Sequence, residues 1–172
     1  MRHTASPRIA LSRIAVSLAL ASSMAVASLA QADEGPDDLY VGVGLFGDML
    51  NVNLEYVSED WGNLALRVGQ FQGVNTGVAG NVSWRKPITA DDPKVDGYFV
   101  GVFAGQIMGD TPGGVVVDRL GVGGEMGYHW VSDYTRKVFS VGLGFPEKVE
   151  RNGQELLTEP TLFFEFSIGL GY

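Results

Sequence analysis

The sequence predicts an all-β fold: an eight-stranded antiparallel up-and-down transmembrane β-barrel, preceded by a cleaved signal peptide. Three observations lead to this prediction. The chain starts with a basic and then apolar leader, its remainder alternates apolar with small or polar residues, and the breaks between alternating segments contain turn-forming residues. Segments of about ten residues match the length that a tilted strand needs to cross a bilayer. We assign residues 1–32 to the signal peptide and 33–172 to the barrel domain.

The leader has the three parts of a secretory signal. Three arginines and no acid precede an apolar run over 14–29, which ends at Ala30-Gln31-Ala32. This order of charge, apolar run and small-residue site is typical of a cleaved signal peptide. A membrane-anchoring helix needs about 20 mostly apolar residues, whereas this run is shorter and is interrupted by serines. Cleavage is therefore predicted after Ala32.

The composition of the mature chain excludes several functions. All 20 acidic residues follow the leader but only 9 of the 12 bases do, so the mature part carries a net charge of −11. Such a charge excludes nucleic acid as a partner. Cysteine is absent, which excludes disulfides, thiolate metal sites and cysteine catalysis. The 24 glycines fit strands whose inner faces need small side chains.

Alternation with a period of two defines the strands. It is clearest where Leu50, Val52 and Leu54 face one way while Asn51 and Asn53 face the other. The predicted strands are 39–46, 49–57, 62–72, 77–86, 96–108, 114–130, 136–145 and 160–172. Most connections are short, and only 146–160 is long enough to present a surface to a partner.

The apolar face is predicted to point outward, because its opposite face is polar. Leu64, Leu66 and Val68 alternate with Asn63 and Arg67, among others. A soluble barrel could not use such a polar, glycine-rich face as its core, whereas a membrane barrel has a polar interior.

The amphipathic aromatic residues all fall at the strand ends of one rim, as expected for an interfacial girdle on the periplasmic side. This predicted girdle consists of Tyr40, Tyr56, Trp61, Trp84, Tyr98, Tyr128, Trp130, Tyr134 and Tyr172. The other rim is predicted to carry only phenylalanines, such as Phe46, Phe71 and Phe145.

The last strand makes a resemblance to a known class possible. It ends in an aromatic residue and has apolar residues at every second position before it: Phe164, Phe166, Ile168, Leu170 and Tyr172. This pattern resembles the insertion signal of outer-membrane β-barrels. The whole mature chain is similar in architecture to the small eight-stranded barrels of Gram-negative outer membranes. The resemblance implies location in the outer membrane, contact with its lipid and recognition by the barrel-assembly machinery.

Charged residues at the alternate strand positions that face the lumen are predicted to pair and fill the interior. They are Glu55, Arg67, Arg85, Arg119, Glu125 and Glu165. An eight-stranded barrel has an interior just wide enough for side chains, which favours a salt-bridged plug over an ion path. Arg119 is expected to pair with Glu165 at similar depth, whereas Glu55 and Arg67 are expected on adjacent strands, nearer the periplasmic half and the middle of the barrel.

No catalytic, metal or cofactor site is predicted. The glycine pattern over 42–47 lacks the following helix that nucleotide binding requires. His129 is the only histidine of the mature chain, and it has no assignable serine or acid partner. We therefore expect a non-enzymatic protein with a structural or surface-interaction role. A narrow channel for small solutes or ions is the alternative, and a lipid-modifying enzyme, a known member of this barrel class, is the third possibility.

Overall fold

A computed structural model of the protein describes eight stretches of the chain, all of them after the predicted leader. The residues that it describes are 39–58, 60–73, 77–89, 92, 94–110, 117–151, 154–156 and 159–171. The predicted signal peptide and Tyr172 lie outside them. None of the described residues forms a helix long and apolar enough to cross a membrane.

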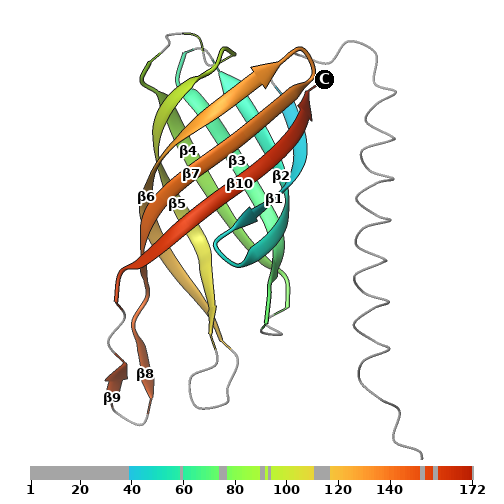
Figure 1. The fold of residues 1–172 in the computed structure, drawn as a ribbon. Coiled ribbons are helices and arrows are strands. Elements are labelled where there is room, and N and C mark those ends of the chain that lie inside the picture. Colours follow the sequence, from blue (N-terminus) through green and yellow to red (C-terminus); the bar gives the residue numbers. More distant parts are fainter. Residues whose placement is uncertain are drawn as a thin grey trace, which may run out of the picture. The chain divides into compact units, whose positions relative to one another are not determined.

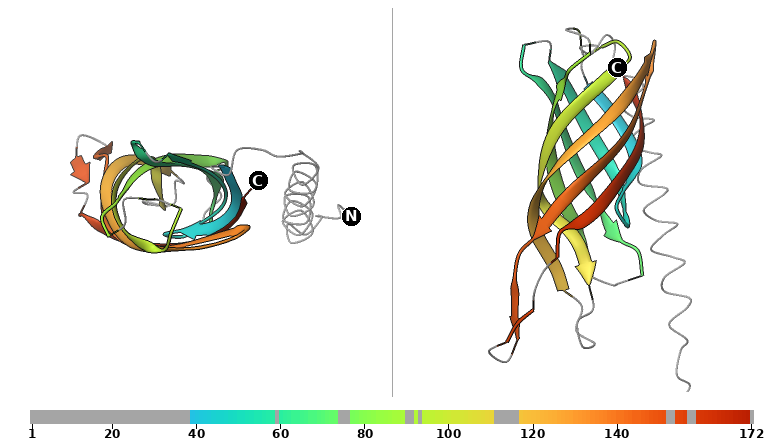
Figure 2. Two further views of the ribbon diagram at one scale, coloured as in Figure 1. Left: turned by 90° about the horizontal axis from the view of Figure 1, so that it is seen from above. Right: turned by 60° about the vertical axis from the view of Figure 1, so that its left-hand side comes forward.

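Eight antiparallel strands close into a barrel, which confirms the predicted eight-stranded antiparallel fold (Figures 1 and 2). Neighbours in the sequence are neighbours in the sheet, and β1 closes the ring against β10. The barrel strands are β1 (Leu39–Phe46), β2 (Met49–Ser58), β3 (Gly62–Phe71), β4 (Ala79–Pro87), β5 (Gly97–Asp110), β6 (Val117–Ser132), β7 (Thr135–Pro146) and β10 (Thr161–Gly171).

The sequence analysis predicts no strand in the long connection between β7 and β10. This connection contains a separate two-stranded hairpin, β8 (Val149–Arg151) and β9 (Gln154–Leu156), which extends beyond the barrel in Figure 1. Strands of three residues are too short to show a period of two, so the sequence pattern gave no signal for them.

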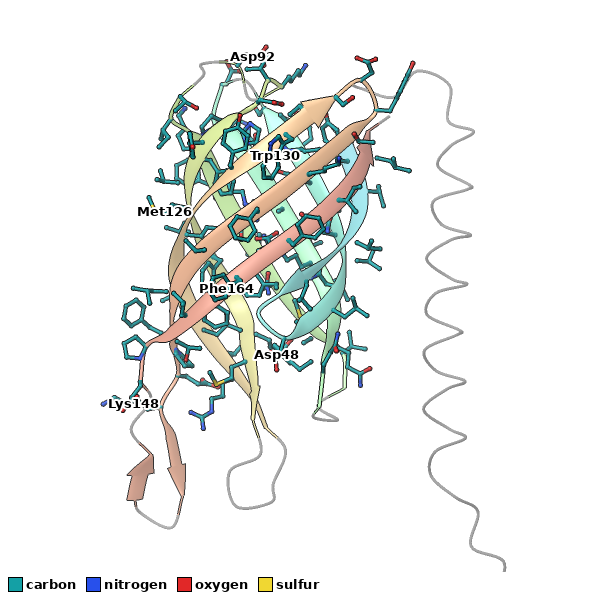
Figure 3. All side chains as sticks on the ribbon, viewed as in Figure 1. Asp48, Asp92, Met126, Trp130, Lys148 and Phe164 are labelled. Carbon is teal, nitrogen blue, oxygen red and sulfur yellow. The ribbon has the colours of Figure 1, made fainter. Side chains whose placement is uncertain are left out.

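The barrel has two different ends, which we call the terminal rim and the distal rim. At the terminal rim β1 begins and β10 ends, and at the distal rim the β1–β2 turn at Gly47 lies close to the start of β10. Figure 3 shows Asp92 and Trp130 toward the terminal rim and Asp48 and Lys148 toward the distal rim.

Alternate residues of every strand face inward, and the polarity follows the predicted inverted pattern. In β2, Asn51, Asn53 and Glu55 are buried, whereas Leu50 and Leu54 are 54% and 40% exposed. A one-residue slip of any strand would move its whole inner set to the outer face. The inner residues therefore specify the register of the strands.

A bulge in β5 shifts its pairing with β6 near the distal rim. The pairing with β6 shifts between Gln106 and Met108, and the intervening Ile107 points into the barrel with no exposed surface. Gly105 takes a φ of 129°, which a side chain would resist, and allows this local change of direction. The sequence prediction did not include this bulge.

The seam between β1 and β10 depends on glycine. A Cβ on Gly42 would collide with the backbone carbonyl of Ile168, and one on Gly44 would lie 2.8 Å from the Phe166 carbonyl oxygen. Neither neighbour can move without displacing β10, so the two strands approach closely only because these positions lack side chains.

Gly42→Val should destabilise the folded barrel by about 1–3 kcal/mol or more, because overpacking at the seam forces the backbone to shift. Val43→Leu is the matched control, because Val43 is the next residue of β1 and its side chain is 47% exposed on the outer face. Urea unfolding of the refolded barrel measures both variants. Equal midpoints for Gly42→Val and the unmodified protein would contradict the close packing at this seam.

Candidate functional site

Arg85 of β4 is the centre of an ion cluster inside the barrel. Its Nε lies 3.1 Å from Oε1 of Glu125, and its Nη1 lies 3.7 Å from Oε1 of Glu55. Its Nη2 also donates a short hydrogen bond to Glu165. One guanidinium thus contacts carboxylates from three other strands, β2, β6 and β10.

Arg67 of β3 forms a second, bidentate contact with Glu165. Its Nη2 donates to both carboxylate oxygens, at 2.8 and 2.7 Å, and its Nε donates at 3.1 Å. Its Nη1 donates to Oδ1 of Asn81 at 2.9 Å and to Oγ of Ser83 at 2.7 Å. The planar guanidinium therefore satisfies most of its donors against β10 and β4.

Arg136 of β7 completes the cluster, and the sequence analysis missed it. Its Nε lies 3.2 Å from Oε2 of Glu55, and its side chain is 1% exposed. The signal was present: Arg136 has the same parity as Ser140, which lies in the polar interior. Ser140 donates from Oγ to Glu125 at 2.6 Å and to Glu165 at 3.4 Å.

The cluster is buried and balanced in charge. Its three arginines and three glutamates have side chains that are at most 7% exposed. Each guanidinium also lies over an aromatic ring: Arg67 over Phe46 at 4.9 Å, Arg85 over Phe99 at 5.1 Å and Arg136 over Tyr40 at 5.8 Å. Cation–π contacts are stronger where water is excluded, so the rings compensate part of the lost hydration.

The predicted pairing of Arg119 with Glu165 is wrong. Glu125 and Glu165 share Ser140 and so lie at one level, while Arg119 precedes Glu125 by six residues of β6, about 20 Å along a strand. Arg119 is buried at the distal rim, opposite Met108 of β5, rather than beside Glu165. Glu55 and Arg67 lie on adjacent strands, as predicted, and each reaches across the interior to other strands.

A layer of apolar side chains fills the lumen between the ion cluster and the distal rim. Phe46, Phe103 and Phe163 pack with ring centroids 5.1–5.6 Å apart. The layer consists of Phe46, Met49, Phe71, Ala79, Phe103, Ile107 and Phe163. The prediction that Phe46 and Phe71 belong to an outer aromatic rim is therefore wrong, and of the three phenylalanines only Phe145 is exposed outside.

The lumen is also occupied toward the terminal rim. His129 has no exposed surface, stacks on Phe99 at 5.9 Å, and its Nε2 lies 2.8 Å from the carbonyl oxygen of Val95 in the β4–β5 connection. The same connection is fixed to β6 by Asp96, whose carboxylate accepts from the backbone N–H of Val131. Val95 and Asp96, at the end of this connection that leads into β5, are therefore bound to β6 at the terminal rim.

The outer surface is apolar, with aromatic residues gathered at the terminal rim. Trp84 donates to the carbonyl of Trp61, and the rings of Tyr98 and Tyr128 lie 4.8 Å apart. The outward members of the predicted girdle are Tyr56, Trp61, Trp84, Tyr98, Tyr128, Trp130 and Tyr134. The prediction that Tyr40 belongs to the girdle is wrong. Tyr40 is 6% exposed and lies inside the barrel against Arg136, because it faces the same way along β1 as Gly42 and Gly44.

The last strand presents its predicted apolar series outward. Phe164, Phe166, Ile168 and Leu170 are 52%, 53%, 38% and 39% exposed. Figure 3 shows Phe164 and Met126 on the outer surface at different heights. Glu165 and Ser167, between them, are buried in the lumen.

These layers give the interior the properties of a plug. The ion cluster, the apolar layer and the buried His129 occupy different levels of the described interior, and the charged groups of the cluster are matched rather than aligned as a row of one sign. No group of three or more metal-ligating side chains was found among the described residues.

Comparisons with known proteins gave no match of any kind. No family model matches the chain. No curated protein matches its sequence, and no solved structure matches its fold.

Arg85→Met should reduce the stability of the folded barrel by about 3–5 kcal/mol, because removing one partner leaves buried carboxylates uncompensated. Lys86→Met is the matched control: it removes the adjacent cation, which is exposed outside. The stabilities of the two variants are compared by urea unfolding, in which the gel mobility of the folded form measures the fraction that remains folded. Equal effects of the two substitutions would contradict a dominant role for the buried cluster.

Arg67→Met and Glu165→Gln should show coupling of about 0.5–3 kcal/mol in a double-mutant cycle, because the residues are in direct contact. Arg119→Met and Glu165→Gln should be additive within about 0.5 kcal/mol, because these residues are far apart. Measured coupling between Arg119 and Glu165 would restore the pairing that the structure contradicts.

Proposed function

We propose that this protein is an integral outer-membrane β-barrel with a plugged lumen and a structural or surface-interaction role, without catalytic activity. In this proposal residues 1–32 direct export and are removed after Ala32. The mature barrel is inserted by the barrel-assembly machinery, which reads the outward apolar series of β10.

The inverted polarity of the barrel carries this proposal. Side chains such as Leu66, Val102 and Phe166 are about half exposed on the outside, while Arg67, Arg85 and Glu165 are buried inside. Soluble monomers rarely expose contiguous apolar patches beyond a few hundred square ångströms, whereas hydrocarbon favours such a surface. The gathering of indole and phenol groups at one rim supports an interface with lipid head groups there.

The plugged interior favours a structural role over transport. A conducting pore needs a continuous wet path, but the Phe46 layer and the ion cluster are both withdrawn from solvent. Breaking the plug would also destabilise the barrel, so a gate at this level would have a high cost.

The topology gives the proposal an orientation. With the terminal rim toward the periplasm, the β8–β9 hairpin and the rest of 146–160 face the cell exterior, where they can contact a surface partner. Glu147 and Lys148, at its base, are exposed.

Cell fractionation tests the location directly. The protein should be recovered with outer membranes and should run faster on unheated than on heated gels, because the closed barrel resists detergent until it is boiled. Recovery as a soluble periplasmic protein would contradict the proposal.

Phe166→Lys should destabilise the barrel in lipid vesicles by about 2–4 kcal/mol, and Leu162→Lys, nearer the distal rim, by about 0–1 kcal/mol. Both side chains are outward and more than half exposed, so a soluble barrel would tolerate the two changes equally. Reversible unfolding from vesicles measures the difference. Similar small losses for both variants would contradict a bilayer around β10.

Planar bilayers test the plug against the channel. The unmodified protein should give no steady ion conductance, and Arg85→Met is expected to be less stable rather than more conductive. A steady, ion-selective conductance of the unmodified protein would favour the channel instead.

A further inference from the structure

At the distal rim, the wall of the barrel does not extend as far at β1 as at its neighbour β10. The pairing of β10 with β1 ends at Glu165, opposite Phe46, while its pairing with β7 continues to Thr161. The last backbone contact across this seam is the hydrogen bond from Gly47 N–H to the carbonyl of Phe164, at 2.8 Å. The distal start of β10 thus extends beyond the β1–β2 turn and leaves a notch in the wall.

A depression of about 450 Å³ occupies this notch. Ile107 and Phe163, both members of the buried apolar layer, form its inner part, and Met108 contributes from the bulge of β5. Leu162 and Phe164, which face outward, belong to the same lining. The depression therefore continues from the mouth of the lumen, over the edge of β10, to the outer apolar surface.

The charge at this depression is negative. Asp48, in the β1–β2 turn, is the only charged side chain among its lining residues in the described part of the chain. Partial burial raises the pKa of its carboxyl, although a hydrogen bond from its own backbone opposes this shift. An ammonium group beside Asp48 would be attracted to its carboxylate, whereas an anionic group would be repelled.

We propose that the notch binds a membrane-borne amphiphile, with one aliphatic chain over Ile107 and Phe163 and an ammonium head group at Asp48. This inference rests on the proposed function, because the ligand enters sideways from the bilayer. The volume lies within the range of about 300–1,000 Å³ that is usual for small-molecule sites. The sealed layer beneath makes the notch a place of binding rather than the entrance to a pore.

Photolabelling tests the site in the full mature barrel, reconstituted in phosphatidylcholine vesicles. The probes are dodecyl chains with a diazirine near the chain end, carrying either a trimethylammonium or a carboxylate head. The ammonium probe should label the inward Ile107 and Phe163 as well as the outward Leu162 and Phe164. Its labelling of the inward pair should exceed that by the carboxylate probe at least fivefold.

Two variants and one control identify the contacts. Met108→Trp fills the depression and should reduce labelling of the inward pair at least tenfold, whereas Met126→Trp, on the outer face of β6, should change it less than twofold. Asp48→Asn, in an exposed turn, should bring the two probes within twofold of each other. Heat-shifted gel mobility verifies that each variant is folded.

The outcomes separate this inference from the proposed function. Labelling of outward residues alone, or no response to Met108→Trp and Asp48→Asn, overturns the binding site and leaves the membrane barrel intact. If outward residues such as Met126 are not labelled at all, the barrel is not in the bilayer, and both proposals fail.

Discussion

The contact of Arg85 with three glutamates is the constraint on which the rest of the barrel depends. Its partners come from β2, β6 and β10, and Glu165 is shared with Arg67 of β3. A buried charge is tolerated only when it is fully paired and hydrogen-bonded, so a slip of any one of these strands would leave several charges unmatched. The cluster therefore links strands that are distant around the ring and selects one register.

This arrangement also explains why the interior is divided into levels. A guanidinium donates hydrogen bonds in its plane and can stack with its face on an aromatic ring, and Phe46, Phe99 and Tyr40 supply these rings next to the carboxylates. Phe46 in turn packs against Phe103 and Phe163, so the aromatic layer begins where the ion cluster ends. The charges fix the register, and the apolar layer excludes water from them, which strengthens each ion pair.

The sequence predicted the strands and most inner faces, because alternation with a period of two records both directly. The sequence analysis did not predict the contacts between side chains that meet across the lumen. Tyr40 was assigned by its place at a strand end, although parity turns it inward toward Arg136. The partners of Glu165 could not be found either, because Arg67 and Arg85 lie on strands that β10 does not pair with, and their contact depends on strand tilt across the lumen. Alternation with a period of two shows which face of the sheet a residue lies on, but not how far along the barrel axis it lies.

The same bulge contributes residues both to the closed interior and to the notch at the distal rim. Ile107, which lies at the bulge, adds a branched side chain to the layer beneath the distal mouth, and the following Met108 lines the notch. Since the levels below are filled by matched charges and rings, a ligand has no need of the axial path, and the low wall at Gly47 offers a lateral one. A barrel that is closed along its axis can thus still have a specific site, provided that the site opens toward the solvent of its outer surface, which in our proposal is lipid.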